Sequence, residues 1–244
     1  MGRTTSVTVS HRNGQCPPTA GFGASAIAVA AVAALLAGGC GKKVGGGSPQ
    51  DKARELAAIA AKQPHGGGKV LADALSDPDP HVRKVALVGL GGYATPQHRE
   101  AIERATHDEH PEVRTSAVCT LGLYRDEAAA ERLGTLLRGD PAEAVRTVAA
   151  SGLGENPSKK AIVLLLENAE NNTNANAQYQ AMTELLGKLG LRFHRKVDPK
   201  GSEWRSLVEE MKHSKIVQAA YAACGVDLVY HPEDKKPNAP GHDK

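Results

Sequence analysis

Aromatic residues are scarce in this sequence: one tryptophan, five tyrosines and two phenylalanines make up 3% of 244 residues. Alanine, leucine and valine therefore carry most of the apolar content, which is 41% of the chain. A core that contains few aromatic side chains can still be densely packed when helices with small side chains lie close to one another. The composition thus favours an all-α protein of closely stacked helices.

The sequence also lacks an excess of one charge. Arg3 and Arg12 are the only Lys, Arg, Asp or Glu residues before Cys40, and 28 basic side chains accompany 27 acidic ones after it. A net charge near +1 beyond Cys40 provides no basic footprint for a nucleic-acid backbone. We therefore expect no nucleic-acid partner.

Sequence motifs of catalysis are missing too. The chain has no Gly-rich phosphate loop, no Gly-x-Ser-x-Gly elbow and no His-Glu-x-x-His segment. Two imidazoles and two carboxylates do occur together at His107-Asp108-Glu109-His110, and these are metal-binding groups. A polar turn between two helices explains the same residues, and we favour that interpretation. We expect no catalytic residue, no cofactor and no metal.

What the sequence does contain is one pattern repeated at a nearly fixed distance. An aspartate is followed by a Val-Arg pair, an alanine and a Leu-Gly pair, and the copies are 31 and then 32 residues apart. A fourth copy, another 32 residues on, keeps the apolar positions but has Asn172 and Gln178 in place of the charged residues. Repeats of this length predict a solenoid. The three full copies are Asp77, Val82-Arg83, Ala86, Leu90-Gly91; Asp108, Val113-Arg114, Ala117, Leu121-Gly122; and Asp140, Val145-Arg146, Ala149, Leu153-Gly154.

Each copy has the pattern of two antiparallel helices. The residues Val82, Ala86 and Leu90 lie on one face of a helix with 3.6 residues per turn, and the spacing recurs in the later copies. Proline near a helix start fits the first turn, and glycine after the repeated leucine is expected to end the helix. We expect first helices at about residues 68–75, 96–106, 126–137 and 158–169, and second helices starting near Pro80, Pro111, Pro141 and Asn174.

These repeated residues resemble the HEAT repeat family, and the short period is similar to its bacterial HEAT-like branch, named after the phycobilisome lyases. The resemblance covers about residues 68–189 and implies a right-handed α-solenoid of antiparallel helix pairs. In that family, loop aspartates and second-helix arginines form a ladder between neighbouring repeats. By position the acceptors are Asp77, Asp108 and Asp140, and the donors are Arg83, Arg114 and Arg146. The alternative is that the three aligned arginines bind an anionic partner.

The resemblance also implies that the second helices line the concave surface. Side chains half a turn from the core would then form a neutral, small and mildly apolar stripe, which favours a protein or peptide partner. The alternative is that these side chains pack against one another. The candidate partner-binding residues are Leu87, Val88, Val118, Cys119, Ala150, Ser151, Tyr179 and Met182.

The chain is predicted to divide into six segments. Residues 1–39 read as a signal peptide, 40–48 as a flexible tether, 49–67 as an N-terminal cap helix and 68–189 as four repeats. Residues 190–230 read as a basic loop followed by a degenerate fifth repeat or a cap, and 231–244 as a disordered tail. Cys119 and Cys224 fall in different helical layers, which stack about 8–10 Å apart, so we expect free thiols.

The N-terminus has the pattern of an export signal. Leu36-Ala37-Gly38-Gly39-Cys40 follows an apolar run and resembles a bacterial lipobox, which implies that Cys40 carries the lipid. Gly41 is not the aspartate that commonly retains lipoproteins at the inner membrane, so the outer membrane is favoured. The alternatives are an uncleaved membrane anchor over the 18 residues 22–39, or a cytosolic protein with a misassigned start.

From these patterns we expect a lipid-anchored, periplasm-facing scaffold or adaptor in the cell envelope that is not an enzyme. Its partners would be a protein or peptide and, through the lipid, a membrane. Two alternatives remain: a lyase-like enzyme or enzyme subunit that uses the solenoid groove, and a structural subunit of an envelope complex.

Overall fold

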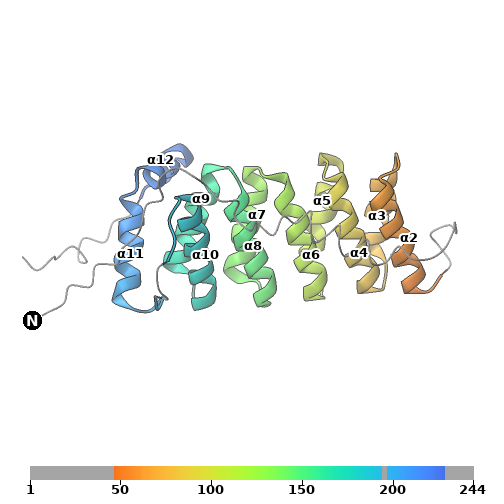
Figure 1. Ribbon diagram of the computed structural model, residues 1–244, viewed down its shortest axis with the longest axis horizontal. Helices are drawn as coiled ribbons and strands as arrows, with labels where there is room; N and C mark the ends of the chain where they lie inside the picture. Colours follow the sequence, from red (N-terminus) through yellow and green to blue (C-terminus); the bar gives the residue numbers. More distant parts are fainter. Residues whose placement is uncertain (1–46, 194–196, 229–244) are drawn as a thin grey trace, which may run out of the picture.

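The structure is a computed structural model that describes residues 47–193 and 197–228 (Figure 1). These residues form α-helices and short 3-10 turns, with no strand among them. The predicted signal peptide, Cys40, most of the tether and the predicted tail lie outside the described residues. No helix within the described ranges is long and apolar enough to span a membrane.

The helices form two rows that lie side by side and run along the long axis of the molecule (Figure 1). The first row contains α3 (Gly67–Asp73, continued by η1, Ala74–Ser76), α5 (Pro96–Ala105), α7 (Glu127–Gly139) and α9 (Lys159–Asn171). The second row contains α2 (Pro49–Lys62), α4 (Pro80–Leu90), α6 (Pro111–Leu121), α8 (Glu143–Glu155) and α10 (Ala175–Lys188). Each helix of the second row packs on the next, and in the first row α3 packs on α5 and α7 on α9; consecutive helices of the chain alternate between the rows. This arrangement is the all-α solenoid that the repeat predicts.

The repeated apolar positions fill the space between the two rows. The valine that precedes each arginine is at most 1% exposed, and the alanine that takes its place in α10 is fully buried. One apolar residue of each first helix faces these positions and is also fully buried. Burying one such side chain contributes roughly 1.5–3 kcal/mol, so the solenoid is stabilised layer by layer. The positions are Val82, Val113, Val145 and Ala177 in the second helices, and Leu71, Ile102, Leu133 and Leu165 in the first.

Two of the three second helices that have a proline near their predicted start begin at that proline. The Asp79 carboxylate caps α4 by accepting hydrogen bonds from the backbone of His81 and Val82, and Pro80 occupies the first position of the helix. Pro111 has the same place in α6. Pro141 lies before Ala142, the N-cap residue of α8, so its ring precedes the helix.

Two of the three Leu-Gly pairs end an α-helix as predicted: α4 ends at Leu90 with Gly91 as its C-cap, and α6 ends at Leu121 with Gly122 as its C-cap. Gly91 and Gly122 keep right-handed helical backbone angles and lead into the 3-10 turns η2 (Gly91–Tyr93) and η3 (Gly122–Tyr124). Gly154 lies inside α8. A Cβ at Gly154 would lie 2.1 Å from Oε2 of Glu184 on α10. At this position glycine therefore permits the close approach of a neighbouring side chain.

The C-terminal helices close the array without continuing its alternation. Helices α11 (Ser202–Lys212) and α12 (Lys215–Cys224) both pack against α9 of the first row. Trp204 of α11 is 2% exposed and donates a hydrogen bond from Nε1 to the carbonyl of Ala169 at 2.9 Å. Its ring stacks with those of Tyr179 and Phe193. This packing describes a cap on the last repeat better than a fifth repeat.

Candidate functional site

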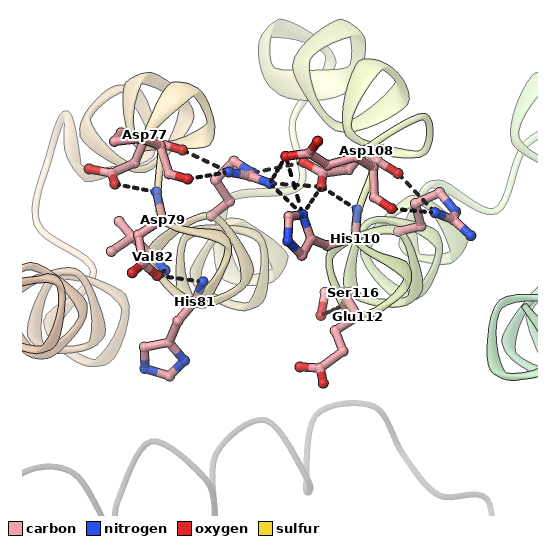
Figure 2. A network of polar contacts seen from close by, with 12 residues as sticks. Asp77, Asp79, His81, Val82, Asp108, His110, Glu112 and Ser116 are labelled. Atoms are coloured by element: carbon pink, nitrogen blue, oxygen red, sulfur yellow. Dashed lines mark hydrogen bonds and ion pairs between the residues drawn. The ribbon is translucent and has the colours of Figure 1, made fainter.

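Neighbouring repeats are joined at one end of the helices by a row of ion pairs. Figure 2 shows the polar contacts around Asp77 and Asp108 in this row. Arg83 of α4 donates from Nε and Nη2 to the two carboxylate oxygens of Asp108, both at 2.8 Å. Arg114 of α6 makes the same forked contact with Asp140, at 2.9 and 3.0 Å. Each arginine also donates from Nη1 to backbone carbonyls of its own turn, such as that of Asp77 at 2.9 Å. We call this row the arginine ladder.

Each aspartate of the ladder also organises its own turn. Asp77 Oδ1 accepts a hydrogen bond from the backbone N–H of Asp79 at 3.0 Å, and Asp108 accepts one from His110 at 2.9 Å (Figure 2). Asp140 accepts the equivalent bond from Ala142 at 2.8 Å. A single carboxylate therefore shapes the turn before its second helix and binds the preceding repeat.

The ladder begins one repeat earlier than the sequence analysis predicted. Lys52 of α2 donates from Nζ to Asp77 Oδ2 at 2.7 Å. Lys52 stands 31 residues before Arg83, the distance of one repeat, and that spacing was the signal that could have identified it. Helix α2 is therefore tied to the array like the second helix of a repeat.

The ladder ends at Arg146, which does not form the predicted contact with a following repeat. Its Nη1 donates to the carbonyls of Asp140 and Pro141, at 2.6 and 3.0 Å. The residue one repeat after Asp140 is Asn172, which still accepts a hydrogen bond from the backbone of Asn174 at 2.9 Å but has no carboxylate. The Nε atom of Arg146 is buried and has no hydrogen-bond partner within the part of the chain that the structure describes.

The ion pairs shift the pKa values of the ladder residues. Burial alone would raise the pKa of Asp108, but the hydrogen bonds from Arg83 and the His110 backbone outweigh it, so this pKa is below its usual value. For Asp77 the burial effect is likewise outweighed by Lys52 and the Asp79 backbone, and its pKa is lowered. The pKa values of Arg83 and Arg114 are raised, first by their hydrogen bonds to Asp108 and Asp140. These shifts mean that the folded chain stabilises the charged forms.

A second row of hydrogen bonds joins the turns at the opposite end of the helices, and we call it the exit ladder. Its donors stand three residues after the repeated leucine, and each acceptor is a backbone carbonyl in the previous turn of the same kind. The regular spacing of these donors is visible in the sequence. The donor changes from tyrosine to asparagine to lysine along the row, so no repeated residue type marks it. The contacts are Tyr93 to Pro64 at 3.1 Å, Tyr124 to Thr95 at 2.9 Å, Asn156 to Asp126 at 2.9 Å and Lys188 to Asn156 at 2.5 Å.

Half of the predicted partner-binding residues lie in the interior. Leu87, Val118, Ala150 and Met182 are at most 1% exposed. They occupy one repeated position on the flank of the second helices, where α4, α6, α8 and α10 pack on one another. Helices in contact leave no room for a partner at that flank. For these four residues the alternative interpretation, that the side chains pack together, describes the structure.

The other four predicted residues lie on the outside of the same helices, and the repeat adds four more. Cys119, Ser151, Thr147 and Thr183 are exposed, and the remaining residues are half-buried. Two hydrogen bonds link neighbouring helices here, from Gln180 to Thr147 at 2.7 Å and from Ser151 to Glu184 at 3.2 Å. We call this surface the second-helix face: Lys84, Val88, Thr115, Cys119, Thr147, Ser151, Tyr179 and Thr183.

The second-helix face is not a broad apolar groove. Within the described residues, the exposed large hydrophobic side chains are Leu123 and Ile216, and both lie on other elements. Cys119 is a free cysteine on this face; although the residue is exposed, its sulfur is partly desolvated, and this desolvation followed by the nearby Glu155 carboxylate raises the pKa of the thiol. A raised pKa keeps this thiol protonated at neutral pH, which disfavours a nucleophilic role. Cys224 is also a free thiol.

The segment His107 to His110 forms a polar turn that belongs to the ladder. The Asp108 carboxylate is bound by Arg83, and His110 Nδ1 lies 3.3 Å from Nη2 of the same arginine. His107 contacts the guanidinium of Arg132. Over residues 47–193 and 197–228 there is no group of three or more His, Cys, Asp or Glu side chains placed to hold a metal ion.

The comparison with protein families agrees with the geometry of the repeats. Residues 68–154 match the family described as HEAT repeats. A comparison with curated proteins finds no match. The matched segment spans α3 to α8 and contains both complete arginine rungs, Arg83 with Asp108 and Arg114 with Asp140. The segment from residue 68 to residue 154 therefore belongs to the HEAT repeat family, within an all-α solenoid that continues to α10.

Proposed function

We propose that this protein is a lipid-anchored scaffold on the periplasmic side of the cell envelope, which holds a protein partner through its second-helix face. HEAT repeats commonly serve as protein-interaction scaffolds. Membership of the family does not specify the membrane attachment, the compartment or the binding surface. We infer these three features from the residues described below.

The observation that carries the proposal is the regularity of the second-helix face. Equivalent positions on α6, α8 and α10 present Cys119, Ser151 and Thr183 to solvent, and all three side chains are short. Ladders of polar contacts at both ends of the helices fix the neighbouring repeats against one another. A surface that is ordered before binding loses little conformational entropy when a partner docks. Short side chains also allow a partner to approach the helices closely.

The proposed attachment depends on the sequence around Cys40. An apolar run followed by Leu36-Ala37-Gly38-Gly39-Cys40 is typical of bacterial lipoproteins, in which the cysteine carries several acyl chains. One acyl chain holds a protein at a membrane only reversibly, whereas two or more give stable attachment. The residues between Cys40 and α2 are rich in glycine, which suits a tether between the lipid and the solenoid.

Photocrosslinking in intact cells tests the binding surface. A photoreactive residue at Ser151 should capture a defined protein partner, and Thr183→Arg should reduce the captured amount at least tenfold because a long charged side chain blocks the face. Thr135→Arg is the matched control: both threonines are exposed and donate a hydrogen bond to a carbonyl four residues earlier, but Thr135 lies on α7 in the first row. Equal loss with both variants, or no loss with Thr183→Arg, would place the binding surface elsewhere.

Fractionation tests the attachment. The Cys40→Ser chain should move from the membrane fraction to the soluble fraction, while Cys119→Ser should stay with the membranes like the parent chain. If Cys40→Ser sediments with membranes as completely as the parent chain, the lipid anchor is wrong.

A further inference from the structure

The last arginine of the ladder is a buried cation for which no counter-ion lies within 4.0 Å among the described residues. Four charged residues are buried within the described ranges: Arg83, Asp140, Arg146 and Lys212. Arg83, Asp140 and Lys212 each have an oppositely charged group within 4.0 Å. Arg146 is 9% exposed, and it forms no ion pair with any of residues 47–193 and 197–228. A buried charge that lacks a partner is strongly unfavourable, so this position is suited to receive an anion.

The two complete rungs show which anion the position is built for. Arg83 and Arg114 use the Nε–Nη2 edge of the guanidinium for a carboxylate and Nη1 for carbonyls of their own turn. Arg146 makes the same Nη1 contacts, with Asp140 and Pro141, so its guanidinium is anchored as in the other rungs. The edge left over is the planar fork that binds a carboxylate through two parallel hydrogen bonds.

Asn172 does not satisfy this edge. Its Oδ1 accepts the backbone N–H of Asn174, and its Nδ2 donates to the Leu137 carbonyl and to Asn168 Oδ1, at 3.3 and 3.1 Å. None of the hydrogen bonds of this side chain within the described residues is to Arg146. Pro141 and Thr173, which follow Asp140 and Asn172 in the chain, are exposed, whereas the Nε atom of Arg146 is itself buried.

We propose that the Nε–Nη2 edge of Arg146 binds an aspartate or glutamate side chain of the protein partner, which completes the third arginine rung from outside the chain. The inference rests on the proposed function for the source of the carboxylate. The site itself follows from the interrupted ladder and does not depend on that function. A scaffold would thereby use the interrupted rung to fix the register of its partner along the array.

An NMR titration tests the site with acetate as the probe. The full chain is purified in detergent with its arginine side chains labelled with ¹⁵N, and the Arg146 Nε–Hε signal is identified by its loss in Arg146→Lys. Sodium acetate should move this signal downfield with saturation in the millimolar range, while sodium chloride at equal ionic strength should not. The signals of Arg83 and Arg114 should stay in place because internal carboxylates occupy their edges. In Asn172→Asp the Arg146 signal should no longer respond, because the new carboxylate fills the site.

Two outcomes overturn the site: an Arg146 signal that acetate does not move, and an equal response to chloride, which would identify an adventitious ion only. The source of the carboxylate is tested separately by the photocrosslink at Ser151. Asn172→Asp and Arg146→Lys should each reduce partner capture at least tenfold, with the folded helix content checked by circular dichroism. Capture that persists in both variants overturns the partner carboxylate and leaves the scaffold standing. If no variant captures a partner, the proposed function fails, and the acetate titration still decides whether Arg146 is a carboxylate site.

Discussion

Arg114 and Asp140 form the same forked ion pair as Arg83 and Asp108, although one more residue separates them along the chain. The Nε–Oδ2 distances are 2.9 and 2.8 Å, with sequence separations of 26 and 25 residues. Helix α7, which lies between Arg114 and Asp140, has 13 residues where α5 has 10. The stacking of the turns therefore fixes the geometry of the ion pair, and the additional residue is accommodated in the segment that contains the first helix.

The first prediction concerns the stability that one rung contributes. Asp108→Asn should lower the free energy of unfolding by about 3 kcal/mol, because Arg83 would be left buried without its carboxylate. The amide oxygen can still accept the His110 backbone hydrogen bond, so the turn is retained. Urea unfolding followed by circular dichroism measures the change. Asp73→Asn at an exposed position should change stability by less than about 0.5 kcal/mol, and an equal effect of both variants would contradict the role of the rung.

The second prediction is an acid sensitivity that arises from the same carboxylates. The pKa values of Asp77 and Asp108 are lower in the folded chain than in the unfolded chain, where aspartate titrates near about pH 4. Their contribution to stability is complete above that pH and is lost as the pH falls through the lower folded values. The free energy of unfolding should therefore decrease steeply below about pH 4. The double variant Asp77→Asn, Asp108→Asn should show a shallower decrease, and a slope identical to that of the parent chain would exclude these two groups as its source.

The third prediction concerns the interrupted rung within the isolated chain. Asn172→Asp should restore a carboxylate opposite Arg146, so the two positions should become energetically coupled. A double-mutant cycle with Arg146→Lys should give a coupling of about 1–3 kcal/mol in urea unfolding. The cycle separates this coupling from the loss of the Asn172 hydrogen bonds to Leu137 and Asn168, which both arms share. Additive effects would show that the new carboxylate does not reach the guanidinium.

The fourth prediction tests the exit ladder. Tyr124→Phe removes only the hydroxyl that donates to the Thr95 carbonyl at 2.9 Å, and it should cost about 0.5–1.5 kcal/mol. Tyr93→Phe should have a similar effect through the Pro64 carbonyl. Tyr179→Phe is the control because the Tyr179 ring stacks on Phe193 and its hydroxyl makes no hydrogen bond that the structure records within the described residues. Thermal unfolding of the three variants should rank the control as the most stable, and a control that is destabilised equally would argue against hydrogen bonding as the cause.

The outcome for the second helices shows which features a repeat pattern predicts. The inward positions of Val82, Ala86 and Leu90 were predictable because the helical period places them on one face, and the copies repeat that face. The Asp and Arg positions of the two complete rungs were predictable by resemblance. Lys52 was missed because its helix, α2, lacks the other residues of the repeated pattern, although the spacing between Lys52 and Arg83 equals one repeat.

The sequence by itself determined the register of the repeats and the residues between the two rows, because a repeated 3.6-residue pattern dictates which side of each helix is apolar. Only the tertiary structure decided which flank positions are covered, since burial of Leu87 and Val118 depends on how closely α4, α6 and α8 approach. It also decided that α12 turns back onto α9 and that no counter-ion meets the guanidinium edge of Arg146 among the described residues. These features depend on distances between segments far apart in the chain, which no local pattern of residues specifies.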